Sequence, residues 1–217
     1  MRRALVPVLL VLAFAACDAD DELPARVRVV HAAPGAGPLD LLIDFEPLAT
    51  DLAFGEASPY VSWEPGLRLL AALTPDAGGL DLTVEEEVIF DEDRDYTLFV
   101  TGFERSSNLV LLTDDRSTIA FGRARLRVVH GAPDAGPLAV RVAPEGGGAA
   151  VLSAADLNAG ETTADVTVEE GRYTLRAEAL GTGPSLDADL DVEERRRYVA
   201  VLLDDGARLT TLLRIDD

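Results

Sequence analysis

The chain has 217 residues, with 39 acidic residues, 19 basic residues that are all arginine, two histidines and one cysteine, and its formal net charge is −20. Apolar residues make up 48% of the sequence, which is enough for a folded core. The single cysteine excludes a disulfide scaffold and a cysteine-based zinc site, and the negative charge argues against a nucleic-acid binder, because phosphate contacts need basic residues.

The N-terminal segment is predicted to be an export signal. Arg2 and Arg3 precede an apolar run of 13 residues, Ala4 to Ala16, which fits a secretory signal peptide and is shorter than the about 20 residues of a membrane-spanning helix. The run ends in Phe14-Ala15-Ala16-Cys17, which resembles a bacterial lipobox, although Phe14 replaces the usual leucine. This resemblance implies that residues 1–16 are a lipoprotein signal peptide and that Cys17 is acylated.

Residues 17–24 then form the acylated cysteine and a short acidic tether. From Asp18 to Pro24 the extended tether spans at most about 25 Å, so the folded part would lie close to the membrane. The expected location is the bacterial cell envelope, with the chain held by its N-terminal lipid and facing the periplasm or the exterior. Two alternatives stay open: a plain signal peptide cut after Ala15, which gives a secreted soluble protein, and a retained anchor.

The rest of the chain contains one sequence unit twice. Residues 25–41 read ARVRVVHAAPGAGPLDL and residues 124–140 read ARLRVVHGAPDAGPLAV, with 12 of 17 positions identical. The offset between matching residues is 99 here and 105 farther on, so the second unit holds about six extra residues, for which Gly146 to Gly148 is a natural place. The predicted domains are residues 25–117 and 124–217.

Both units are expected to be all-β. Apolar and polar residues alternate in runs near residues 26–31, 38–45, 58–63, 67–73, 80–84, 95–102 and 108–113, separated by turn residues. This pattern predicts two tandem antiparallel β-sandwich, immunoglobulin-like domains. Tyr96 and Tyr198 each open the sixth run, a placement similar to the tyrosine corner of such domains. Because the connector is short, the units are expected to touch, with Ile119 and Phe121 either in the junction or in the flanking strands.

The quoted motif carries a family resemblance. The segments RVVHAAPGAGPLDL and AFGEASPY, followed by an EPG turn, resemble the opening of the bacterial domain-of-unknown-function family 4397. The resemblance covers both units and implies export, frequent lipoprotein anchoring, tandem copies and a β-sandwich, and it adds no catalytic residue. The second unit departs from the pattern, with residues 157–161 in place of the Ala-Phe-Gly segment and Ala139 in place of the strand's acidic residue.

His31 and His130 occupy equivalent positions in the two units. Each ends an apolar row just before a turn that contains Pro34 or Pro133. They could bind metal or sense pH, but a ring nitrogen hydrogen-bonded to the turn is the simpler interpretation. One histidine per unit, without cysteine, does not fill a zinc site.

The acidic clusters raise the question of calcium. Asp91, Asp93 and Asp95 form a tight acidic loop and are the candidates for a weak Ca²⁺ site, whereas Asp187, Asp189 and Asp191 alternate with apolar residues as the solvated face of a strand does. No cofactor other than this calcium ion is expected. A calcium-dependent adhesion module is therefore the first alternative for the function.

Pro59, Tyr60 and Trp63 lie together in the first unit only, where they could bind a glycan or a peptide, although burial of Trp63 in the core is the favoured interpretation. Neither a Gly-x-Ser-x-Gly elbow nor a phosphate-binding loop occurs in the sequence. The sequence therefore favours a non-catalytic binding or scaffolding module with an unidentified protein or glycan partner, and it sets no oligomeric state. A hydrolase with paired carboxylates is a distant alternative.

Overall fold

The computed structural model describes residues 23–76, 79–103, 106–204 and 209–216. The predicted signal peptide, Cys17 and most of the tether lie outside these residues. The first unit contains β1 (Ala25–Ala32), β2 (Leu39–Ile43), β3 (Glu46–Leu52), β4 (Val61–Trp63), β5 (Gly66–Asp76), β6 (Gly79–Phe90), β7 (Asp95–Phe103) and β8 (Ser106–Asp114). The second contains β9 (Arg123–His130), the 3-10 turn η1 (Pro133–Ala135), β10 (Leu138–Pro144), β11 (Leu152–Leu157), β12 (Val166–Glu169), β13 (Gly171–Ala179), β14 (Ser185–Val192), β15 (Arg197–Asp204) and β16 (Leu209–Asp216).

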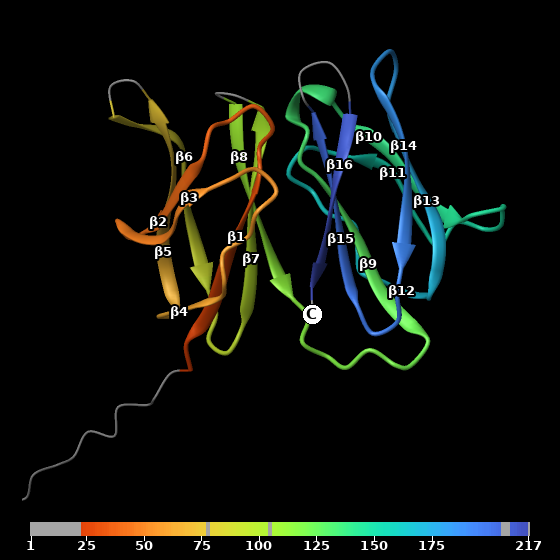
Figure 1. Cartoon of the computed structure of the whole chain (residues 1–217), viewed down its shortest axis with the longest axis horizontal. Helices are drawn as coiled ribbons and strands as arrows, with labels where there is room; N and C mark the ends of the chain where they lie inside the picture. Colours follow the sequence, from red (N-terminus) through yellow and green to blue (C-terminus); the bar gives the residue numbers. More distant parts are fainter. Residues whose placement is uncertain (1–22, 77–78, 104–105, 205–208, 217) are drawn as a thin grey trace, which may run out of the picture.

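Each unit is a sandwich of two four-stranded sheets (Figure 1). In the first unit the orders are β3-β2-β5-β6, which we call outer sheet 1, and β4-β1-β7-β8, inner sheet 1. In the second they are β11-β10-β13-β14, outer sheet 2, and β12-β9-β15-β16, inner sheet 2. The strands correspond one to one between the units. The predicted pair of all-β sandwiches is confirmed.

One strand pair in each unit runs parallel, which the alternation pattern does not reveal. β1 pairs in parallel with β7, and β9 pairs in parallel with β15. A parallel pair needs a long connection between its strands, and here the intervening strands supply it by crossing to the outer sheet and back. The other pairs in the described sheets are antiparallel, as expected.

Within the run expected at residues 38–45, the strand β2 ends at Ile43, and β3 (residues 46–52), which follows after a turn, lies outside every expected run. Asp44 and Phe45 both adopt positive φ angles, 51° and 69°, and form a two-residue hairpin turn between β2 and β3. The second unit replaces this turn by a longer loop between Pro144 and Leu152, in which Gly146, Gly147 and Gly148 also have positive φ. The extra residues of the second unit therefore lie where the glycine run predicted them.

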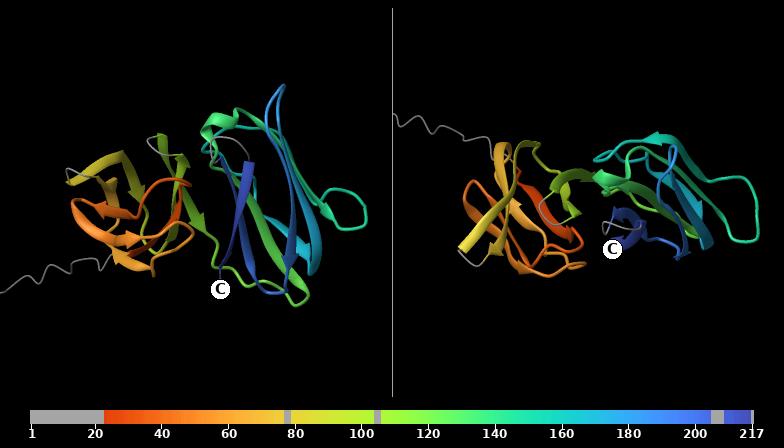
Figure 2. Two further views of the ribbon diagram at one scale, coloured as in Figure 1. Left: turned by 45° about the horizontal axis from the view of Figure 1, so that its top comes forward. Right: turned by 90° about the horizontal axis from the view of Figure 1, so that it is seen from above.

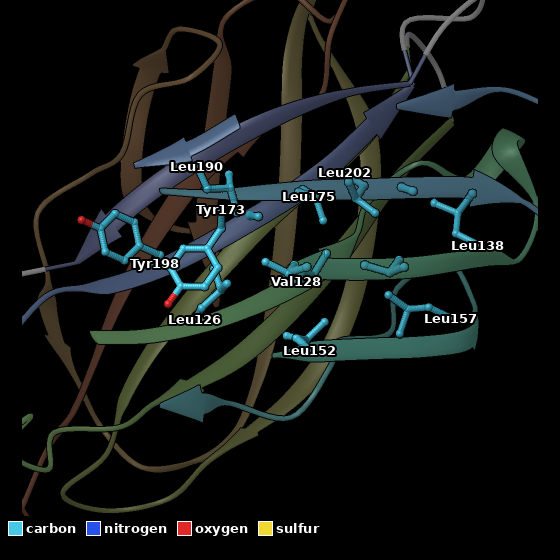
Figure 3. Packing of buried hydrophobic residues seen from close by; sticks show 14 of the residues in the cluster. Leu126, Val128, Leu138, Leu152, Leu157, Tyr173, Leu175, Leu190, Tyr198 and Leu202 are labelled. Atoms are coloured by element: carbon cyan, nitrogen blue, oxygen red, sulfur yellow. The ribbon is translucent and has the colours of Figure 1, made fainter. Parts of the chain in front are cut away.

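Separate apolar cores fill the two sandwiches. The first core includes Leu41, Leu70, Phe90 and Leu98, all essentially inaccessible to solvent. Figure 3 shows the second core, in which side chains from both sheets of the unit meet between the layers. Full burial of one such side chain contributes about 1.5–3 kcal/mol, and each of these two cores lies within a single sandwich.

A third apolar cluster joins the two units. It lies between the inner sheets, which face each other as the middle two of four layers (Figures 1 and 2). Its members are Val30, Ala32, Phe99, Val110 and Leu112 of the first unit and Val129, Val199, Val201 and Leu203 of the second. The units are therefore packed together by the outward faces of their inner sheets.

Gly131 lies directly against Thr101 of the first unit. A Cβ atom on Gly131 would stand 2.7 Å from Cγ2 of Thr101 in the first unit and 3.1 Å from the carbonyl oxygen of Leu202. The equivalent position of the first unit is Ala32, so the repeated motif differs here because only hydrogen fits against Thr101.

The connector contributes less to this junction than the sequence suggested. Ile119 is buried, but Phe121 is 84% exposed and precedes β9. Phe121 therefore belongs neither to the apolar cluster of the junction nor to a flanking strand. The inner sheets supply the apolar contact between the units.

Candidate functional site

His31 is fixed by the turn that follows β1. Its Nε2 donates to the carbonyl oxygen of Gly37 at 3.0 Å, and its Nδ1 accepts the N–H of Ala33 at 3.2 Å. Because the Ala33 N–H must meet an unprotonated nitrogen, the ring is the neutral Nε2–H tautomer. Burial lowers the pKa of His31, since the charged imidazolium would lose its hydration.

His130 repeats this arrangement in the second unit. Its Nε2 lies 2.8 Å from the carbonyl oxygen of Gly136, its Nδ1 accepts the N–H of Ala132, and burial again lowers its pKa. Pro133 begins the short turn η1 that places Gly136, as Pro34 lies in the corresponding turn of the first unit. Both ring nitrogens of each histidine are thus used within the motif.

Tyr96 and Tyr198 hold the loops before their strands. The hydroxyl oxygen of Tyr96 accepts the N–H of Asp91 at 3.0 Å, and that of Tyr198 accepts the N–H of Glu193 at 2.8 Å. In each unit the bond reaches back five residues. Both tyrosines are buried, so each covers one end of its core and also orders the loop before its strand.

Arginines neutralise the acidic loop of Asp91, Asp93 and Asp95, the candidate calcium ligands. The Asp95 carboxylate, whose side chain is 6% exposed, pairs with Arg26 and lies 3.2 Å from Nε of Arg116. Arg116 also pairs with Asp93 at 3.0 Å, and Asp91 is engaged by Tyr96. A calcium ion would have to displace these cations. Within the described ranges no three His, Cys, Asp or Glu side chains converge on a possible metal position.

Polar contacts connect the two units at the end of the junction that lies near the connector. Asp114 of β8 accepts hydrogen bonds from Tyr60 at 2.8 Å and Thr97 at 2.7 Å, and Arg127 of the second unit reaches it at 3.1 Å. Burial raises the pKa of the Tyr60 hydroxyl, and the Arg28 guanidinium lies 4.6 Å from the centre of its ring. A cleft of about 370 Å³ opens beside them, lined by Arg26, Tyr60, Asp95, Asp114, Asp115, Arg116 and Arg197.

The carboxylates of this cleft already have partners. Besides Asp95 and Asp114, Asp115 forms an ion pair with Arg125 of β9. Such bridges between the units orient them and oppose their separation. The cleft is therefore part of the junction.

A second pocket lies at the C-terminal end of β4 in the first unit. It has a volume of about 300 Å³ and is lined by Asp44, Glu46, Ser62, Trp63, Glu64 and Arg68. Trp63 is only partly buried: it packs against the first core and also faces this pocket. The favoured interpretation, burial of Trp63 in the core, holds only in part.

The Asp44 turn and Arg68 build the pocket wall. Asp44 accepts the N–H of Leu69 at 2.9 Å and pairs with Arg68 at 3.1 Å. Arg68 also donates to the carbonyl oxygens of Glu64 and Pro65, at 3.0 and 2.9 Å. The sequence grouped Trp63 with Tyr60 and Pro59, but Tyr60 belongs to the junction. Glu64 follows Trp63 directly in the sequence, but Asp44 and Glu46 come close to it only in the folded chain, through the hairpin of β2 and β3.

The structure thus defines an all-β protein of two sandwiches packed face to face. A sequence profile of the family described as "Domain of unknown function (DUF4397)" matches residues 25–141, from β1 of the first unit into β10 of the second. The chain belongs to this family. A comparison with curated proteins found no match. No helix in the described ranges is long and apolar enough to cross a bilayer.

Several solved structures are similar to the chain at low identity. The tip fimbrial protein Mfa3 of Porphyromonas gingivalis is 9% identical, with 90% of this chain and 99% of that chain covered and a TM-score of 0.32. A candidate cell adhesion protein of Bacteroides uniformis is 11% identical, with 88% and 98% covered and a TM-score of 0.32. The Bacillus anthracis TIE protein is 10% identical with a TM-score of 0.30; 85% of this chain is covered, but it spans only 34% of the TIE chain.

Proposed function

We propose that this protein is a lipid-anchored component of the bacterial cell envelope, in which two copies of the family domain follow a lipoprotein signal peptide and act as a non-catalytic binding or scaffolding module. The observation that carries the proposal is the apolar cluster between the inner sheets, together with the ion pairs beside it. These contacts hold the two units as one body, so that a partner bound to either unit is held at a fixed orientation to the other.

The polar residues of the repeated motif support a structural role for that motif. His31 and His130 use both ring nitrogens inside their own turns, and Tyr96 and Tyr198 hold backbone groups. A general base must reach a proton on a substrate, and these groups are buried. The chemistry of the motif therefore serves the fold, and binding is assigned to the surface.

The N-terminal sequence supports anchoring. Cys17 is the only cysteine of the chain and directly follows the apolar run of residues 4–16. Two or three acyl chains on Cys17 would anchor the protein stably, because each buried CH₂ group contributes about 0.8 kcal/mol. Since β1 begins at Ala25, the first unit would be the one next to the membrane.

The test is the mass of the N-terminal peptide from protein isolated from its own membranes. We expect a diacylated or triacylated peptide that begins at Cys17, and we expect Cys17→Ala to abolish the modification and the membrane attachment. Asp18→Asn is the matched control, since it changes the next residue and keeps the sulfur. An unmodified N-terminus near Ala16, with the protein in the soluble fraction, would overturn anchoring in favour of secretion.

A further inference from the structure

The pocket beside Trp63 has unused hydrogen-bond acceptors. Glu46 and Glu64 are both exposed, and among the described residues neither carboxylate has an ion-pair or hydrogen-bond partner. Ser62 and the indole of Trp63 complete the accessible lining. The free groups of the pocket are therefore two negative charges, a hydroxyl and an aromatic ring.

Arg68, the one cation of the pocket lining, is already engaged. Arg68 directs Nε to the carbonyl oxygen of Glu64 and its two terminal nitrogens to Asp44 and the carbonyl oxygen of Pro65. Its charge is compensated by Asp44, whose second oxygen accepts the N–H of Leu69. The pocket lining carries three carboxylates and one guanidinium, so its net charge is −2. An anionic ligand would meet repulsion without a free cation.

From this chemistry we propose that the Trp63 pocket binds a basic side chain, an ammonium or guanidinium group, of a partner polypeptide. A cation over the face of tryptophan is attracted by the ring quadrupole, and Glu46 and Glu64 are placed to receive its N–H groups. The overall charge of −20 attracts basic partners from a distance. A neutral sugar is the poorer ligand, because it gains no charge attraction from a lining with a net charge of −2.

The surroundings of the pocket favour a polypeptide over a free amine. Phe45 projects at the turn between Asp44 and Glu46 and is 77% exposed. Phe45 therefore offers apolar contact next to two residues of the charged lining, which suits a segment with a basic residue next to an apolar one.

The second unit does not repeat the side chains of this pocket. Trp63 corresponds to Val168, which is buried, and Arg68 corresponds to Tyr173, which is also buried. The Tyr173 hydroxyl donates to the carbonyl oxygen of Glu169 at 2.8 Å, the bond that Arg68 makes to Glu64 in the first unit. The two units thus share the backbone contact but differ in what surrounds it, and the site belongs to the first unit alone.

Fluorescence of the full chain tests this inference directly, because Trp63 is the only tryptophan. The probe is a blocked Gly-Arg-Gly peptide, with its lysine counterpart, its uncharged citrulline counterpart and the neutral sugar maltotriose as comparisons. We expect a saturable change of Trp63 emission with the arginine and lysine peptides and none with the other two. The inference rests on the proposed binding role and not on acylation, so the Cys17 test can fail while this one succeeds.

Paired substitutions separate the pocket from general attraction by the acidic surface. Glu46→Gln with Glu64→Gln should weaken peptide binding roughly three- to thirtyfold, as expected for the loss of two exposed charge contacts. Glu85→Gln with Glu87→Gln removes the same charge from the exposed face of β6 and should leave binding within about twofold of the parent. Equal weakening by both pairs, a response to maltotriose, or a response to the citrulline peptide equal to that of the arginine peptide would overturn the proposal.

Discussion

Replacement of Gly131 by alanine tests the contact between the two units. The added Cβ would lie 2.7 Å from Cγ2 and 3.0 Å from Cβ of Thr101, and 3.1 Å from the carbonyl oxygen of Leu202. Thr101 is fully buried and β-branched, so it has little freedom to turn away. Overpacking of this kind costs about 1–3 kcal/mol. For a chain of this size each kcal/mol lowers the melting temperature by roughly 2–4 °C.

Urea unfolding, followed by circular dichroism, measures this loss of stability. Gly37→Ala is the matched control: a Cβ on Gly37 meets no atom within 4 Å, so the change should stay within about 0.5 kcal/mol. Thr101→Ser removes the nearest methyl group and should restore part of the stability of Gly131→Ala. If Gly131→Ala unfolds at the same urea concentration as the parent, the inner sheets do not meet as described.

Two further predictions concern the repeated motif. The lowered pKa values of His31 and His130 mean that, below their ordinary value near 6.5, the unfolded chain binds more protons than the folded one. These groups should therefore leave stability unchanged above pH 7 and lower it between pH 6.5 and 5, by up to about 1.4 kcal/mol per pH unit for each histidine. Urea midpoints measured at several pH values check this. A stability that rises as the pH falls through that interval would contradict it. Tyr198→Phe removes the acceptor of the Glu193 N–H and should cost about 1–3 kcal/mol, whereas unchanged stability in the same assay would show that this bond contributes nothing.

The strand pattern was largely predictable because it depends on local alternation. The exception is the turn at Asp44 and Phe45, where two residues other than glycine adopt positive φ. Without an Asn-Gly or Asp-Gly signal the sequence does not mark this hairpin, and β3 falls outside the expected runs. The parallel pairing of β1 with β7 was equally hidden, because it depends on which sheet each intervening strand joins.

The candidate site was less predictable than the fold. Trp63 is the single tryptophan, but two of its three acidic neighbours, Asp44 and Glu46, come from the β2–β3 hairpin and are distant from it in the sequence. Asp91, Asp93 and Asp95 formed the more conspicuous acidic cluster in the sequence. Their arginine partners are Arg26, which is far from them in the sequence, and Arg116 in the connector. Only the folded chain shows that these arginines neutralise the loop.

The contact between the inner sheets has a consequence for assemblies of this domain. Val30 and Val129 occupy equivalent positions in the two units, as do Phe99 and Val201, so each unit contributes the same strands to the contact, with Val199 and Leu203 where the first unit has Thr97 and Thr101. A contact between equivalent faces is closed: each face covers the other, and neither is left over to propagate the arrangement. The chain is in effect a dimer made from one polypeptide. A third domain joined to either terminus would find both docking faces occupied, and an isolated unit would expose its apolar face to solvent.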